Sequence, residues 1–235
     1  MDELKALTVA SFVALVLVVA VSAAVMGDSS RIPHAPRSNG ADALSGMNVS
    51  DKMNGGATGD QSDQARVMPL FLQSDPQWEG KPYGSDTIRE SGCGLCCAAM
   101  AFSYCTGYLV SPDGLADYVG DSAMVYSNDG SLVNDMGAFG QHGRDLYGLQ
   151  VSDIYYDVDE AMQAVRDGGV VWCGMHGELA DARYDGHVIL LYANNDGVVL
   201  LRDPASEKNS TSEFREDYLK EYVSWDYFYT VREGE

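Results

Sequence analysis

Basic residues are scarce in this sequence of 235 residues. It has 15 Lys and Arg against 35 Asp and Glu, which gives a formal net charge of −20. From residue 67 onward, 28 acidic residues stand against 10 basic ones, a balance of −18. Because a surface of this sign repels phosphate groups, nucleic acid is excluded as a partner. The acidity fits solubility or a saline habitat better than a face that selects basic substrates.

The sequence also lacks the cysteine pattern of a disulfide framework. It has five cysteines, an odd number: Cys93, Cys96, Cys97, Cys105 and Cys173. The first four fall within one expected helix, where fixed Cβ positions disfavour disulfide pairing. At least one thiol should therefore stay free. No second Cys/His pair with zinc spacing is present except Cys173 with His176, so we predict no metal and no cofactor. The absence of an internal repeat excludes a solenoid.

The first 66 residues differ in character from the rest. The segment 6–26 is almost wholly apolar and has about the 20 residues that span a bilayer as a helix. Small residues close it, as at a signal cleavage site. We predict that 1–26 is a signal peptide or membrane anchor, and that the protein is secreted or anchored to the outer face of the cell membrane. Residues 27–66 read as a flexible linker, and the folded domain as 67–235.

The domain begins with helix signals. A buried helix is expected over 92–106, ended by Gly107, and a second after the cap Ser111. Asp157 opens another amphipathic helix. Weaker patterns suggest helices over 131–147 and 212–222. The segments 121–130 and 177–186 are expected to be loops that line a cleft.

Strand patterns dominate the C-terminal half. They cover 170–175, 187–193, 198–202 and 225–231. The turn residues 194–197 between the second and third predict a hairpin. Helices followed by an antiparallel sheet indicate an α+β fold in which the central helix packs on the sheet.

Cys93 is the strongest candidate for chemistry. It lies between Gly92 and Gly94 at the start of the expected central helix. The free N–H groups and the positive dipole end of a helix stabilise a thiolate there. The flanking glycines allow a sharp turn and close approach of a substrate carbonyl. These features predict a nucleophilic thiol.

Two further candidates lie at one end of the expected hairpin. A two-residue loop at 195–196 places His187 opposite Pro204, and a three-residue loop over 194–196 places it opposite Asp203. Side chains paired in this way lie about 4.5–5.5 Å apart at Cβ. The Asp203 carboxylate can then accept the Nδ1–H of His187 and leave Nε2 for the thiol. This predicts a triad in the order Cys, His, Asp.

Gln73 completes the constellation. Its side-chain N–H₂ and the backbone N–H of Cys93 are suited to hold the oxyanion of a tetrahedral intermediate.

These motifs resemble the double-glycine, bacteriocin-leader-type cysteine peptidases, and within them the stand-alone exported branch of that papain-like group. The resemblance covers about 67–205 and is carried by Leu72–Trp78, Tyr83-Gly84, Ser91–Gly94, Gly186–Val188 and Asp203-Pro204. It implies a papain-like fold and thiol-dependent hydrolysis of amide bonds in a peptide or protein substrate. It also implies that Cys93 is the nucleophile, His187 the base, Asp203 its orienting partner and Gln73 the oxyanion donor.

Two other functions stay open at this point. One is a catalytically idle papain-like module that binds peptides or cell-wall material at the cell surface. The other is a thiol-disulfide protein that uses Cys93 and Cys96 as a redox pair. Neither substrate specificity nor oligomeric state can be read from the sequence.

Overall fold

The computed structural model describes residues 66–127, 130 and 132–234 of the chain. The first part of this range is mainly helical, with α1 (Ile88–Ser91), α2 (Cys93–Thr106), α3 (Pro112–Val119), the 3₁₀ turn η1 (Gly120–Ala123) and α4 (Met136–Tyr147). Two small hairpins accompany these helices: β1 (Pro82–Tyr83) with β2 (Asp86–Thr87), and β3 (Met124–Tyr126) with β4 (Leu132–Asn134). The predicted membrane-spanning segment 6–26 lies outside the described residues. Among those that are described, no helix is both long and apolar enough to cross a bilayer.

The second part forms a six-stranded antiparallel sheet in the order β5-β10-β6-β7-β8-β9. Its strands are β5 (Gln150–Val151), β6 (Val170–Leu179), β7 (Ala182–Asn195), β8 (Val198–Arg202), β9 (Glu213–Arg215) and β10 (Ser224–Arg232). The helices α5 (Val158–Arg166), α6 (Glu207–Ser210) and α7 (Glu216–Tyr222) lie between them in sequence. The predicted α+β class is confirmed.

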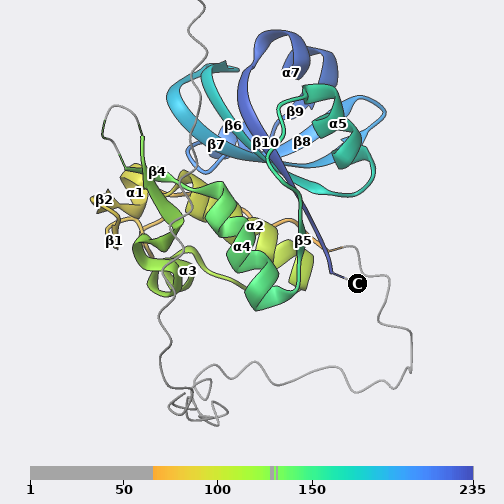
Figure 1. Ribbon diagram of the computed structural model, residues 1–235. Coiled ribbons are helices and arrows are strands. Elements are labelled where there is room, and N and C mark those ends of the chain that lie inside the picture. Colours follow the sequence, from red (N-terminus) through yellow and green to blue (C-terminus); the bar gives the residue numbers. More distant parts are fainter. Residues whose placement is uncertain (1–65, 128–129, 131, 235) are drawn as a thin grey trace, which may run out of the picture. The chain divides into compact units, whose positions relative to one another are not determined.

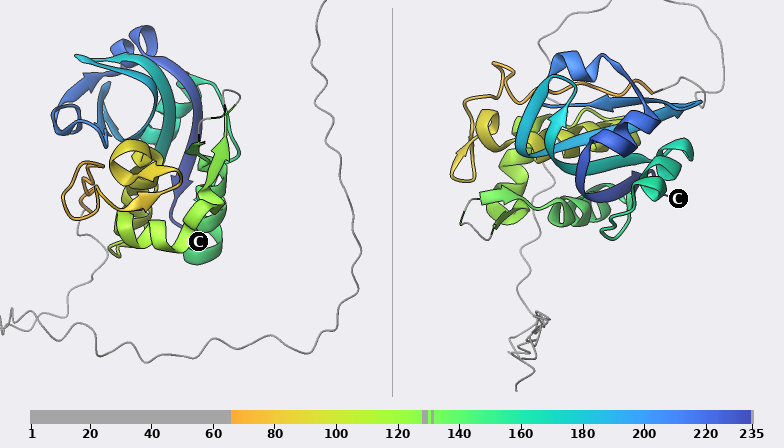
Figure 2. Two further views of the ribbon diagram at one scale, coloured as in Figure 1. Left: turned by 90° about the vertical axis from the view of Figure 1, so that its left-hand side faces the viewer. Right: turned by 90° about the horizontal axis from the view of Figure 1, so that it is seen from above.

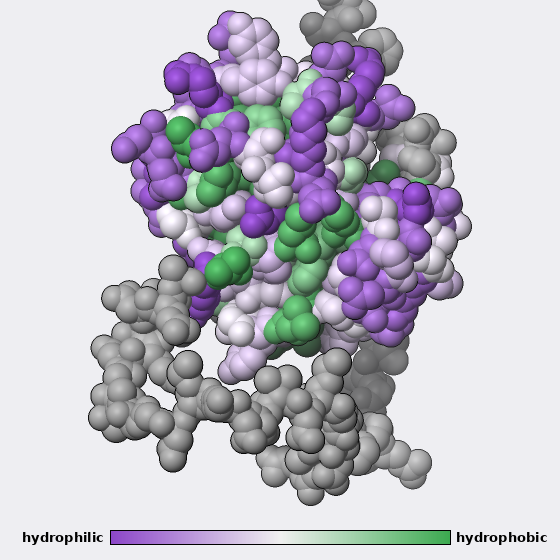
Figure 3. Space-filling model, turned by 180° about the vertical axis from the view of Figure 1, so that it is seen from behind, coloured by the Kyte–Doolittle hydropathy of each residue, from purple (hydrophilic) through white to green (hydrophobic). Residues whose placement is uncertain are grey.

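Helices pack against both faces of this sheet. In β6, Val170 and Trp172 belong to one buried cluster with α2, whereas Val171 and Cys173 belong to a second cluster with α5 and α7. Alternate strand residues therefore face opposite layers, as the pleat requires. Figure 1 shows α2, α3 and α4 grouped beneath the sheet, and Figure 2 shows how strongly the sheet curves. Figure 3 shows the back of the molecule, where an apolar band runs between hydrophilic flanks.

The central helix α2 follows the prediction closely. It begins at Cys93 and ends at Thr106, and Gly107 adopts the left-handed conformation (φ 75°) that closes many helices. Its residues from Gly94 to Ser103 are all buried, which explains why the sequence is apolar on every side rather than on one face. The helix thus fills the core, and its first residue, Cys93, lines a pocket.

Four local predictions are wrong. The segment 131–147 is not one helix, because β4 precedes α4 and the Asp135 side chain caps α4 at the Ala138 N–H. The segment 212–222 begins as strand β9, where buried Phe214 pairs with Val199 and extends the sheet. The expected loop 177–186 is instead the paired end of β6 and β7, turning at Ala180 and Asp181. The expected loop 121–130 contains β3, which pairs with β4.

Candidate active site

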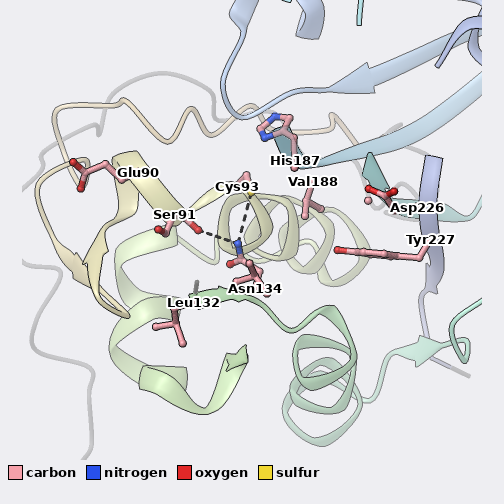
Figure 4. Close-up of a pocket in the computed structure, with 12 residues that line it drawn as sticks. Glu90, Ser91, Cys93, Leu132, Asn134, His187, Val188, Asp226 and Tyr227 are labelled. Carbon is pink, nitrogen blue, oxygen red and sulfur yellow. Dashed lines mark hydrogen bonds between the residues drawn. The ribbon is translucent and has the colours of Figure 1, made fainter. Parts of the chain in front are cut away.

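A pocket of about 330 Å³ lies between the start of α2 and the sheet. Its lining comes from the α1–α2 junction, β4, β6, β7 and β10, and comprises Glu90, Ser91, Cys93, Leu132, Val133, Asn134, Gly174, Gly186, His187, Val188, Asp226 and Tyr227. Figure 4 shows Cys93 and His187 on neighbouring walls of this pocket, the first on α2 and the second on β7. The pocket therefore gives a ligand access to both side chains.

Cys93 is half-buried at the first position of α2. Burial acts to raise the pKa of its thiol, but the hydrogen bond and charge of His187 act against it. The backbone N–H groups of Val188 and Gly94 also stabilise the thiolate, and together these contacts hold the pKa of Cys93 below its usual value. The arrangement therefore favours the thiolate more strongly than in an ordinary cysteine.

His187 lies in β7, opposite Met175 of β6, and is only 8% exposed. Burial acts to lower the pKa of the imidazole, but hydrogen bonds to Asp203 and Cys93 outweigh it and raise the pKa to about 9. The ring of Tyr184 stacks on the imidazole, with ring centroids 4.1 Å apart and an interplanar angle of 15°. The imidazole of His187, held between Asp203 and Cys93, is therefore protonated below about pH 9.

Asp203 is fully buried, yet its carboxylate is completely satisfied by hydrogen bonds. Oδ1 accepts from His187 Nε2 at 2.8 Å and from the Ala205 N–H at 2.9 Å. Oδ2 accepts from Tyr184 Oη at 2.7 Å and from Asn209 Nδ2 at 2.9 Å. Burial acts to raise the pKa of this carboxyl, but its hydrogen bonds, led by that of His187, bring it below the usual value. Asp203 therefore stays charged.

The turn of the β7–β8 hairpin differs from both predicted loops. Asn195 pairs with Val198, so the turn residues are Asp196 and Gly197. Both have positive φ values, 52° and 82°, as a type I′ turn requires. Asp-Gly suits these angles, and this preference fixes the turn one residue later than the predicted two-residue loop.

The predicted pairing of His187 with Asp203 or Pro204 is consequently wrong. The register also shifts at Tyr192, where β7 bulges, and β8 ends at Arg202. Asp203 therefore lies just beyond the end of its strand and reaches His187 from there through its side chain.

The predicted use of the two ring nitrogens is also wrong. Nε2 of His187 bonds to Asp203, which leaves Nδ1 for Cys93. The reason is the position of the sulfur, which also receives the backbone N–H of Val188 and so lies close to the β7 backbone. Nδ1 is the ring nitrogen nearer to that backbone.

Gln73 lies near the same end of the sheet without lining the pocket. Its backbone N–H donates to the Pro204 carbonyl at 2.9 Å, which ties the segment before α1 to the residue after Asp203. Its side-chain Nε2 donates to the Arg89 carbonyl oxygen, and its Oε1 is buried without a hydrogen-bond partner. One of the two N–H groups of the Gln73 amide is thus engaged outside the pocket in this structure.

Sequence reasoning missed several polar contacts of the site. Tyr184 is three residues before His187, an odd spacing that would put the two on opposite faces of a regular strand. A bulge in the β6–β7 pairing between them brings the rings together. Asn209 sits in α6, one short turn after Asp203, and is 1% exposed. The clustering of short polar residues after Asp203 was the available signal for it, whereas no pattern pointed to Asn134, which donates toward Cys93.

The remaining cysteines are free and buried in the core. Burial raises the pKa of Cys96, Cys97 and Cys173 far above the usual value and that of Cys105 to about 11. Among the described residues, no three His, Cys, Asp or Glu side chains are grouped so that they could hold a metal ion. Cys173 and His176 point apart, since the first is buried and the second bonds to exposed Asp226 at 2.7 Å.

A family model described as the Peptidase_C39 like family matches residues 68–232. The match spans most of the chain, and the protein belongs to this family of papain-like cysteine peptidases. The α+β papain-like fold and the resemblance predicted from the sequence are thereby confirmed, and family membership supports cysteine peptidase activity. A crystal structure of a candidate C39-like peptidase from Bacillus anthracis aligns with 72% of this chain and 96% of its own, at 17% identity and a TM-score of 0.46. No curated protein matches the sequence.

Proposed function

We propose that this protein is an exported cysteine peptidase that cleaves peptide bonds in a peptide or protein substrate. Cys93 serves as the nucleophile, His187 as the acid and base, and Asp203 as the group that orients the imidazole. The observation that supports the proposal is the hydrogen-bonded chain from Cys93 through His187 to Asp203 at the wall of an open pocket.

The chemistry follows from the charges of the site. The Cys93 thiolate attacks the carbonyl carbon, and the His187 imidazolium gives its Nδ1 proton to the departing amine as the C–N bond breaks. The neutral imidazole then accepts a proton from the water that attacks the thioester. The C–S bond breaks, the carboxylic acid leaves, and the thiolate–imidazolium pair is restored. Asp203 accepts the Nε2–H throughout and keeps the ring in the orientation that these transfers need.

In this scheme Gln73 is the oxyanion donor that the family resemblance implies. One N–H of its Nε2 donates to the Arg89 carbonyl in the free protein, which leaves the second N–H as the donor for the oxyanion. The backbone N–H of Cys93, at the start of α2, is the second donor.

Hydrolysis of fluorescein-labelled casein by the full chain tests the proposal. Cys93→Ala and Cys93→Ser should both lose iodoacetamide-sensitive turnover. Cys105→Ala is the matched control, because Cys105 lies in the same helix but at its opposite end, and its turnover should persist. Turnover that survives in the Cys93 variants would refute the assigned nucleophile.

The two alternatives predict other results. An idle module that binds peptides or cell-wall material would show no acylation of Cys93, yet the lowered pKa of this thiol is what an active nucleophile needs. A Cys93–Cys96 redox pair would exchange with glutathione. The complete burial of Cys96 and the raised pKa of its thiol oppose that role.

A further inference from the structure

We propose that Asn134 donates a hydrogen bond from its side-chain amide to the oxyanion formed when Cys93 attacks a substrate carbonyl. This inference rests on the proposed function and adds a catalytic residue to it. Asn134 is the last residue of β4 and lines the same pocket as Cys93.

The amide of Asn134 is held in one orientation by its contacts. Nδ2 donates to the Ser91 carbonyl at 2.9 Å, and Oδ1 accepts from the Tyr83 hydroxyl at 2.9 Å. These two bonds aim the second N–H of Nδ2 at Cys93 Sγ, 3.6 Å away. Figure 4 shows both Nδ2 contacts beside the pocket. A donor fixed in advance loses no orientational freedom when charge develops in the transition state.

Two neighbours make this placement possible. Gly94, the second residue of α2, leaves room for Asn134, because a Cβ there would lie 2.6 Å from Asn134 Cβ and 2.7 Å from its Cγ. Tyr83 is 3% exposed, and burial raises the pKa of its phenol well above the usual value, so it remains a hydroxyl donor. The amide therefore lies directly over the first turn of the helix that carries the nucleophile.

The chemistry needs a donor at this place. When Sγ bonds to the carbonyl carbon, the π electrons move to the carbonyl oxygen, which is then two bonds from the sulfur. An N–H that contacts Sγ in the free protein is within reach of that oxygen. On collapse the C–N bond breaks and the amine leaves with the proton of His187, so Asn134 transfers no proton. Gln73, in contrast, donates to Arg89 and does not line the pocket.

The test compares two reactions of Cys93 in the full-length protein. Acylation by N-benzyloxycarbonylglycine p-nitrophenyl ester passes through a tetrahedral oxyanion, whereas alkylation by iodoacetamide displaces iodide and forms none. Relative to wild type, Asn134→Ala should slow acylation by about 10²–10³-fold. The same variant should change the alkylation rate by less than about threefold. Tyr83→Phe removes the hydroxyl that holds Asn134 Oδ1 but leaves the amide of Asn134 in place. This variant should therefore slow acylation less than Asn134→Ala does. Asn195→Ala, at the exposed last residue of β7, should change neither rate.

Several outcomes would overturn the proposal. Unchanged acylation in Asn134→Ala, together with a loss in Gln73→Ala, would mean that Gln73 and the Cys93 N–H bind the oxyanion without Asn134. An equal loss in both reactions would mean that Asn134 acts on the thiolate and not on the oxyanion. Failure of the proposed function gives a different result, because Cys93 of the wild-type protein would then be alkylated but not acylated. That result would refute both the nucleophilic role of Cys93 and the oxyanion role of Asn134. Retained melting temperatures in the variants show that the comparison concerns folded protein.

Discussion

At the residue scale, the site is governed by opposed effects on one ion pair. Burial penalises charge on both Cys93 and His187, yet their mutual attraction and the carboxylate of Asp203 favour the charged forms. The thiolate and imidazolium are therefore present together between the lowered pKa of Cys93 and the raised pKa of His187.

The pH profile of kcat/KM should reflect this window. Activity should rise with pH as Cys93 loses its proton, at a pH below that of an ordinary thiol. It should fall again near pH 9, where His187 loses the proton that the leaving amine requires. Initial rates of casein hydrolysis from pH 4 to 11 measure both limbs. A rate that keeps rising through pH 10 would contradict the acid role of His187.

Replacement of Asp203 by alanine should move the alkaline limb. The hydrogen bond and charge of Asp203 raise the pKa of His187, so their removal lowers that pKa and shifts the limb below pH 9. The turnover should also fall, because Nε2 of His187 loses the hydrogen bond that holds the ring in place. The same pH series on Asp203→Ala measures whether the alkaline limb of the kcat/KM profile moves to lower pH. An alkaline limb that stays near pH 9 would mean that Asp203 serves only to support the fold.

Tyr184 should be a positioning residue that acts through Asp203. Tyr184→Phe keeps the ring stacked on His187 but removes one of four hydrogen bonds to the buried carboxylate. A hydrogen bond to a charged group contributes about 1.5–3 kcal/mol, so the free energy of unfolding should fall by that order. Urea denaturation measures this loss. A stability equal to wild type would show that water replaces the hydroxyl.

At the element scale, the junction between α1 and α2 sets the position of the nucleophile. Gly92 joins the two helices, and a Cβ on it would lie 2.3 Å from the Ile88 carbonyl oxygen. Gly92→Ala should therefore force the helices apart, destabilise the fold by about 1–3 kcal/mol and displace Cys93. Gly80→Ala is the matched control, since nothing lies within 4 Å of its Cβ position. Thermal melting and iodoacetamide labelling together detect both effects.

Local sequence signals predicted the elements that depend on local chemistry. The cap Ser111, the stop Gly107 and the acidic start at Asp157 all mark helix ends in the structure. The hairpin was predicted, but its register was not, because the bulge at Tyr192 depends on packing that no short pattern records. Likewise, the sequence around Phe214 predicts a surface helix, whereas in the structure Phe214 pairs with Val199 at the edge of the sheet. That pairing depends on the tertiary fold.

The candidate site was predictable to a similar extent. Cys93, His187 and Asp203 were predicted, and the structure brings them together, although through different atoms and a different register than expected. Asn134 was not predicted because it comes from a two-stranded hairpin that joins the helical half to the site. Only the tertiary fold makes that residue a neighbour of the thiol.

At the scale of the whole molecule, the leading segment bears on where the protein works. The apolar segment 6–26 predicts export, either as a secreted form or with a membrane tether. Full-length protein with a C-terminal tag should therefore appear in the medium or the membrane fraction of its host, and deletion of 1–26 should retain it in the cytosol. Full-length protein confined to the cytosol would refute export.

The pH dependence of iodoacetamide labelling at Cys93 tests the central claim most directly, because it measures the thiolate that His187 stabilises. Mass spectrometry should find Cys93 as the labelled cysteine in the native protein, with labelling that begins below the pH at which an ordinary thiol ionises. In His187→Ala the onset should move upward, since burial then raises the pKa of Cys93 without opposition from the imidazolium. The same onset in both proteins would mean that the imidazole does not activate the sulfur.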